Sequence, residues 1–148
     1  MYTIIDTGSN AIYFSSLYYE DFIRKLFSYV EGGTVWALKD GIIETLCYDF
    51  PPIYFMFDNK WIMVSPSDYV LDITDDQDRS LCVLMIFPQI SAFHVIGMPL
   101  LMDYYTIHEM DNNRIGFAPH NNSLKPKLEE VESVPLNLFD GSQRIVET

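Results

Sequence analysis

Short apolar runs separated by turn residues make up most of this sequence, and this pattern restricts it to a mainly β fold. Leu81 to Phe87 predicts a strand that is buried on both faces, and His94 to Ile96 predicts a short strand that Gly97 ends. Two further pairs of runs enclose a polar turn and predict β-hairpins: Ile53 to Phe57 with Trp61 to Val64 around Asp58-Asn59-Lys60, and Tyr104 to Ile107 with Arg114 to Phe117 around Asp111-Asn112-Asn113.

One segment near the N-terminus has helical periodicity instead. From Ser15-Ser16 onward, apolar residues recur at steps of three and four positions, namely at Tyr19, Phe22, Ile23, Leu26 and Val30. This spacing predicts an amphipathic helix that a serine caps and that Gly32-Gly33 ends. The expected fold is therefore mainly β with one amphipathic helix.

Length and charge narrow the class of protein further. The chain has 148 residues, of which 49% are hydrophobic, and this is enough for one domain with a core. Its longest apolar run, Leu81 to Phe87, has seven residues, whereas a membrane-spanning helix needs about 20, so we expect no membrane span. A net charge of −12 opposes binding to nucleic acid. The start lacks the features of a secretory signal, so the chain is not exported on its own or an upstream part is absent.

The composition changes after Pro119. We expect residues 1–119 to form the domain and residues 120–148, which contain few large apolar side chains, to form an extended or disordered tail. Asn121-Asn122-Ser123 in this tail matches an N-glycosylation acceptor. Asn121 is therefore a candidate glycosylation site if the chain enters the secretory pathway.

The cysteines and histidines do not form a metal-binding pattern. The chain has two cysteines, Cys47 and Cys82, and three histidines, His94, His108 and His120, and no pair among them has zinc-type spacing. We therefore expect no metal and no cofactor, and we interpret His94 and His108 as strand residues. The spacing leaves open whether the two cysteines form a disulfide or are buried free thiols.

The feature that points to chemistry is an acid on a tight turn. The β-rich run Tyr2 to Ile5 leads directly into Asp6-Thr7-Gly8-Ser9-Asn10, where glycine and short polar side chains predict a turn. Two interpretations fit this motif by itself. Asp6 is a catalytic carboxylate, or it forms an Asx-type turn in which the carboxylate only accepts hydrogen bonds from nearby backbone N–H groups.

Further segments, which begin about 90 residues after Asp6, add context to the motif. His94-Val95-Ile96-Gly97 is followed by Pro99 to Ile107 and then by Asp111 to Pro119. In this order, together with Asp6-Thr7-Gly8-Ser9, these segments resemble the C-terminal lobe of the pepsin-like aspartic proteases. The resemblance covers about four fifths of the chain, and the closing hairpin is its most specific part. It implies a single lobe of that fold, without the strands that precede the catalytic loop in a complete lobe.

The resemblance implies a role for each residue of the loop. Asp6 would be one of two catalytic carboxylates that share a proton and activate water to hydrolyse a peptide bond. Thr7 would tie the two catalytic loops together, Gly8 would allow their close approach, and Ser9 would bond the outer oxygen of Asp6. Gly97 would pack beside the loop, where a side chain would displace it.

The resemblance also covers positions outside the loop. Asn10 and Ile12 become candidates for lining the cleft that binds a polypeptide substrate. Cys47 and Cys82 fall where the family has a disulfide, which would place the protein in the endomembrane lumen, such as a lysosome or vacuole, or outside the cell. Met98 departs from the family, which usually has Asp after the glycine, and we expect this change to affect only local packing.

The chain has a single Asp-Thr-Gly loop, whereas enzymes of this class use two. One hypothesis is that it is the C-terminal portion of a two-lobed acid protease whose N-terminal lobe lies on another polypeptide. A second is a homodimer in which a twofold axis pairs two copies of Asp6, as in the retroviral proteases. A third is a catalytically inactive remnant, or interaction domain, that keeps the fold.

Overall fold

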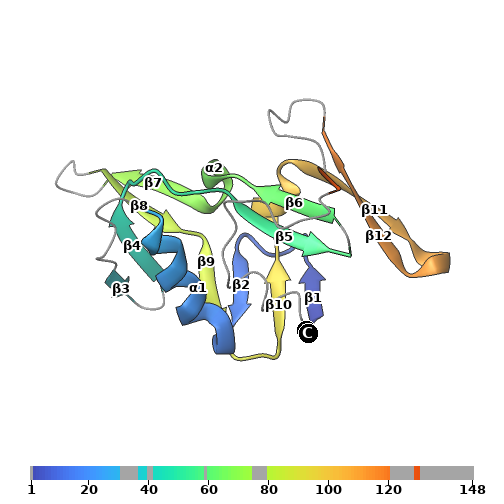
Figure 1. Ribbon diagram of the computed structural model, residues 1–148, viewed down its shortest axis with the longest axis horizontal. Helices are drawn as coiled ribbons and strands as arrows, with labels where there is room; N and C mark the ends of the chain where they lie inside the picture. The colour runs from blue at the N-terminus through green and yellow to red at the C-terminus, as the bar shows by residue number, and fades with distance from the viewer. Residues whose placement is uncertain are drawn as a thin grey trace.

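The computed structural model describes residues 2–30, 37–39, 42–58, 60–74, 80–120 and 129–130, and it confirms a mainly β fold (Figure 1). The strands are β1 (Tyr2–Ile5), β2 (Ile12–Ser15), β3 (Ala37–Lys39), β4 (Ile42–Leu46), β5 (Ile53–Phe57), β6 (Lys60–Val64), β7 (Val70–Thr74), β8 (Ser80–Leu84), β9 (Ile86–Gln89), β10 (Phe93–Ile96), β11 (Tyr104–Glu109), β12 (Arg114–Pro119) and β13 (Glu129–Glu130). The helices are α1 (Ser16–Ser28), α2 (Pro66–Tyr69), α3 (Met98–Leu101) and the 3-10 helix η1 (Met110–Asn112).

One sheet brings together strands that lie far apart in the sequence. Its order is β1-β10-β2-β9, with β1 parallel to β10, β10 antiparallel to β2, and β2 parallel to β9. Ile5 at the end of β1 pairs with Ile96 at the end of β10. Because parallel strands end at the same edge of a sheet, Asp6 after β1 and Gly97 after β10 lie at one edge.

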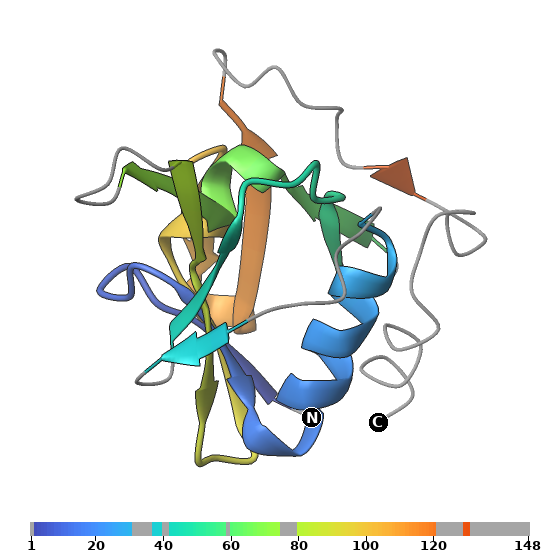
Figure 2. The ribbon, with the colours of Figure 1, turned by 90° about the vertical axis from the view of Figure 1, so that its left-hand side faces the viewer.

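Helix α1 covers one face of this sheet, and the loop between β1 and β2 projects on the other side (Figure 2). The predicted start of the helix and its apolar face are confirmed: the helix buries Tyr19, Ile23, Leu26 and Phe27. The ring of Phe22 also stacks on that of Phe14 in β2, with 4.3 Å between the centroids. Burial of this face against the sheet, rather than helix propensity, accounts for most of the stability of such a helix.

The two ends of α1 differ from the prediction. Ser15 is at the N-cap position, but its side chain makes no capping hydrogen bond. At the other end the helix stops at Ser28, because its last turn tightens: Tyr29 donates its N–H to the carbonyl of Leu26 at 3.2 Å. Gly32 and Gly33, the predicted end of the helix, lie outside the described residues.

The apolar run Leu81 to Phe87 forms two strands, so the prediction of one continuous strand is wrong. β8 belongs to the sheet β3-β4-β8-β7, and β9 belongs to β1-β10-β2-β9. Met85 between them donates its N–H to the carbonyl of Tyr69 at 2.7 Å and accepts the N–H of Ile12 at 2.9 Å. The chain therefore passes from one sheet to the other at Met85, within one apolar run.

Both predicted hairpins are confirmed. β5 pairs with β6 and β11 pairs with β12, each in antiparallel register. The turns use Asp58 at φ 56° and Asn113 at φ 51°, residue types that tolerate the left-handed region because their short polar side chains can bond locally. The β11–β12 ribbon projects from the rest of the fold (Figure 1), and Phe117 near its base stacks on Phe57 of the other hairpin at 5.4 Å.

A continuous core joins the sheets to α1. The largest side chains that it buries completely are Phe14, Tyr69, Ile12, Ile23, Leu26, Ile43, Ile53, Ile62, Leu84, Ile86, Ile96 and Leu100. In the described part of the chain, no helix has both the length and the apolar character that crossing a membrane would require. Of the expected tail, residues 120–148, the structure describes His120, whose N–H donates to the carbonyl of Asp103 at 3.0 Å, and β13, which pairs with β6. Asn121 lies outside the described residues.

Candidate active site

Asp6 stands at the first position after β1, and the neighbouring strand fixes its backbone. The N–H of Asp6 donates to the carbonyl of Ile96 at 3.0 Å, which extends the β1–β10 pairing by one bond. The N–H of Ser9 then donates to the carbonyl of Asp6 at 3.2 Å and closes a tight turn. The loop therefore begins at a hydrogen-bonded strand and turns back over Asp6, its first residue.

Each oxygen of the Asp6 carboxylate accepts one hydrogen bond from this turn. The N–H of Gly8 donates to Oδ1 at 2.9 Å, and the hydroxyl of Ser9 donates to Oδ2 at 2.7 Å. The Ser9 hydroxyl first, and the Gly8 N–H second, hold the pKa of Asp6 below its usual value of 3.8, because both bonds favour the charged form. The turn thus orients an ionised carboxylate.

Replacing Ser9 with alanine should raise the pKa of Asp6, because the hydroxyl is the largest cause of its depression. The measurement is the titration midpoint of the Asp6 carboxyl carbon by NMR in both proteins. An unchanged Asp6 midpoint in the variant would contradict the role given to this hydroxyl.

The backbone of the loop rests directly on Gly97. Gly97 donates its N–H to the carbonyl of Ala11 at 3.1 Å, and Met98 donates its N–H to the carbonyl of Ser9 at 2.8 Å. A Cβ on Gly97 would overlap the Ser9 carbonyl oxygen and would lie 2.7 Å from the Ser9 Cβ. Only glycine leaves room for this contact. Because Met98 contributes its backbone N–H, the bond does not depend on the side chain at that position.

The structure brings Asp6, Gly8, Ser9 and Gly97 together. Thr7 and Asn10 are exposed on the same loop. Ile12 is 0% exposed, because β2 turns its side chain into the core, so the expectation that it lines a substrate cleft is corrected.

The sequence interpretation missed the backbone groups that hold the loop in place. The carbonyl groups of Ile96 and Ala11 and the N–H of Met98 contribute no side-chain signature. Their sequence signal is indirect, and it consists of two apolar residues followed by a glycine at Val95-Ile96-Gly97.

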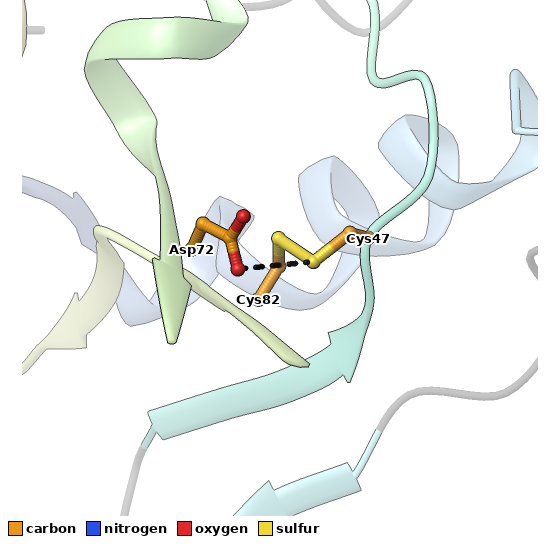
Figure 3. Close-up of side chains that lie close together, drawn as sticks. All are labelled: Cys47, Asp72 and Cys82. Atoms are coloured by element: carbon orange, nitrogen blue, oxygen red, sulfur yellow. Dashed lines mark hydrogen bonds between the residues drawn. A yellow bond between two sulfur atoms is a disulfide. The ribbon is translucent and has the colours of Figure 1, made fainter. Parts of the chain in front are cut away.

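Cys47, which follows β4, and Cys82 in β8 form a disulfide, with 5.0 Å between their Cα atoms (Figure 3). Asp72 lies beside it, with its Oδ1 3.9 Å from the Cys47 sulfur. These three residues form a cluster of potential metal ligands, but the joined sulfurs are not thiolates, which are the form that binds metal. Closing a loop of 35 residues contributes about 3 to 4 kcal/mol in the chain-entropy model.

Comparisons with known proteins all find proteases of one kind. A model of the family described as eukaryotic aspartyl protease matches residues 1–120. The chain is 25% identical to pepsin B of Canis lupus familiaris in an alignment 121 residues long, which covers 78% of this chain and 29% of that protein. It is 32% identical to cathepsin D of Homo sapiens in an alignment 73 residues long, which covers 46% of this chain and 18% of that protein.

A plant protein is similar over a longer stretch. The chain is 25% identical to aspartic proteinase 39 of Arabidopsis thaliana in an alignment 143 residues long, which covers 86% of this chain and 28% of that protein. The chain therefore spans between 18% and 29% of the length of these relatives.

Proposed function

The chain belongs to the eukaryotic aspartyl protease family, and we propose that it supplies Asp6 as one of two carboxylates with which an aspartic endopeptidase activates water to hydrolyse a peptide bond. The observation that supports this most directly is the pair of hydrogen bonds that Asp6 accepts, one on each oxygen. A carboxylate held in this way has a fixed orientation and keeps its charge, as a general base requires. A carboxylate engaged only in a local turn would not need the contact between Ser9 and Gly97.

In the proposed reaction the two carboxylates have different tasks. The ionised one removes a proton from water while the water oxygen bonds to the carbonyl carbon of the substrate. The protonated one donates its proton to the carbonyl oxygen, so that a tetrahedral diol forms. In the second step a proton passes to the amide nitrogen, the C–N bond breaks, and a carboxylic acid and an amine leave. Two carboxylates that occupy one site share one proton, because the repulsion between their negative charges raises the pKa of one of them.

The second carboxylate would come from outside these 148 residues, because Asp-Thr-Gly occurs once in them. The first candidate for its source is an N-terminal protease lobe, and the second is another copy of this chain. The small share of the relatives' length that this chain spans supports the first candidate. Thr7 and Asn10, both exposed beside Asp6, would be available to contact the partner loop and the substrate.

The setting of the proposed activity follows from the disulfide. A Cys47–Cys82 bond persists in an oxidising compartment, so the working location would be the endomembrane lumen or the cell exterior. The substrate would be a polypeptide.

Cleavage should require assembly, because one carboxylate cannot act as acid and base together. The measurement is hydrolysis of an acid-denatured protein at about pH 4, by the chain alone over a wide range of concentrations and by mixtures with a separate polypeptide that carries a second strand–Asp–Thr–Gly loop. We expect the chain alone to be inactive when dilute and the mixture to be active. A rate that rises with the square of the chain's own concentration would identify a second copy as the partner.

Two outcomes would count against this proposal. A rate proportional to concentration in a chain whose mass remains that of a monomer would mean that one carboxylate suffices. No cleavage under any pairing would favour a catalytically inactive interaction domain.

A further inference from the structure

A buried histidine links β10, an inner strand of the sheet β1-β10-β2-β9, to the start of α1. His94, the second residue of β10, is 2% exposed. Its Nδ1 accepts the backbone N–H of Ser15 at 3.1 Å, and Ser15 is the N-cap residue of α1. This bond satisfies the backbone N–H of the N-cap residue itself. The side chain of His94 therefore joins β10 to the residue at which α1 begins.

The bond requires the neutral form of the imidazole. Because Nδ1 accepts a hydrogen bond, it carries no proton, and the proton of the neutral ring is on Nε2. Nε2 is buried and has no hydrogen-bond partner among the described residues. Protonation of Nδ1 would turn it into a donor that faces the N–H donor of Ser15, and the hydrogen bond between them would be lost. It would also place a positive charge at the N-terminal end of a 13-residue helix, where the helix dipole disfavours it.

The groups packed around His94 do not compensate for a positive charge. From β2 it meets the ring of Phe14 edge-on, with 5.0 Å between centroids, and from α1 it meets the ring of Tyr18 at 6.0 Å. In β1 its register partner is Thr3. Burial first, and the charge of the amino terminus second, lower the pKa of His94 from 6.5 to about 4. Among the described residues, no carboxylate is a cause of this shift.

The strand that His94 anchors is the one on which the Asp6 loop rests. Two residues after His94, the carbonyl of Ile96 accepts the N–H of Asp6 at 3.0 Å, and the next residue is Gly97, against which Ser9 packs. β10 is also the strand between β1 and β2, which flank the loop. Any loosening of β10 at His94 therefore acts on both ends of the loop.

We propose that His94 is a positioning residue that ties β10 to the start of α1 only while it is neutral, so that acidification loosens the frame behind the Asp6 loop. The part that concerns catalysis rests on the proposed function, whereas the effect on the fold does not. In an enzyme that works in acid, His94 would therefore set the lower limit of the working pH, although it lies outside the catalytic loop.

The direction of the effect on stability follows from the two pKa values. In the unfolded chain His94 takes up a proton near pH 6.5, and in the folded chain it does so near pH 4. The stabilisation is complete above pH 6.5 and decreases as the pH falls from 6.5 to 4, because only the unfolded state gains the proton there. Below pH 4 both states are protonated, and this group causes no further loss.

The test compares the wild type with His94→Asn, whose side-chain oxygen can accept the Ser15 N–H without titrating near neutral pH. The matched control is His108→Asn, which removes an exposed histidine on β11. Urea unfolding is followed between pH 7 and pH 4. As the pH falls from 6.5 to 4, the unfolding equilibrium constant of the wild type and of the control should rise about tenfold more per pH unit than that of His94→Asn. Between pH 7 and pH 4 this difference should reach about a hundredfold in total. Equal pH dependence in all three proteins would overturn the proposal.

A second measurement does not depend on the variant folding. The ring protons of His94 in the wild type are titrated by NMR, and a midpoint near 4 is expected, whereas a midpoint at or above 6.5 would overturn the proposal. In an active assembly, His94→Asn should move the acid limb of the pH–rate profile to lower pH. If no assembly is active, the proposed function is at fault, and the unfolding and NMR results still decide the role of His94.

Discussion

Replacement of Asp6 by asparagine should lower kcat/KM for peptide hydrolysis by about a thousandfold or more in any assembly that this chain activates, because an amide cannot take a proton from water. The Oδ1 of asparagine can still accept the N–H of Gly8, so the turn should keep its shape. The measurement is initial rate against substrate concentration near the acid optimum, with circular dichroism to verify that the fold is unchanged. We expect kcat to fall with little change in KM.

The matched control for this prediction is Asp111→Asn, which removes the same charge from an exposed turn between β11 and β12. It should leave kcat unchanged and so separates the effect of Asp6 from that of net charge. If Asp6→Asn and Asp111→Asn had equal rates, Asp6 would have no catalytic role and the proposed function would be wrong.

Replacement of Gly97 by alanine should be the most damaging small change to the fold. The new methyl group would overlap the carbonyl oxygen of Ser9 and lie 2.7 Å from its carbonyl carbon, and both of these are backbone atoms that cannot rotate away. To relieve the overlap, the loop has to move and lose the 2.8 Å hydrogen bond from the Met98 N–H to Ser9. We expect a loss of about 3 kcal/mol in the free energy of unfolding.

The control for Gly97 is Gly116→Ala on β12. A methyl group there would have its nearest neighbour, the Cβ of Ile107, at 3.6 Å, which is an ordinary contact. Urea unfolding of both variants at neutral pH gives the comparison, and Gly116→Ala should change stability by well under 1 kcal/mol. A wild-type midpoint for Gly97→Ala would show that the loop does not rest on this residue.

The elements that local sequence predicts well are those whose cause is local. The hairpins β5–β6 and β11–β12 follow from polar turns that tolerate the left-handed region, at Asp58 and Asn113. The apolar face of α1 follows from its spacing. In each case the residues that determine the structure are neighbours along the chain.

The predictions that fail depend on distant parts of the chain. Leu81 to Phe87 has nothing in its composition to mark a break at Met85, because the cause is two hydrogen bonds, to Tyr69 and Ile12, that exist only after folding. Ser15 has the expected position for a cap, but its hydroxyl is buried and has no hydrogen-bond partner among the described residues, while its backbone N–H donates to a histidine from β10. No local pattern contains the order β1-β10-β2-β9.

The contacts of the candidate site likewise divide into local ones and ones with distant parts of the chain. The bond from the Gly8 N–H to Asp6 is of the kind that an Asx-type turn predicts, and the bond from the Ser9 hydroxyl is expected from the resemblance to the family. The support from Ile96 and Gly97 comes from about 90 residues away. Sequence therefore identifies the acid and its immediate donors, whereas only the structure gives the backbone frame that holds them.

The pairing of β1 with β10 also determines when this site can form. Tyr2 lies opposite Phe93, so most of the chain has to be synthesised before β1 has a partner. At about 5–20 residues per second, a ribosome releases Asp6 several seconds before Gly97. Contacts between such distant segments form late in folding, because a long loop has to close first. Until β10 has been synthesised, the nascent chain therefore lacks the backbone partners of the Asp6 loop, and the loop reaches its final geometry only when β10 pairs with β1.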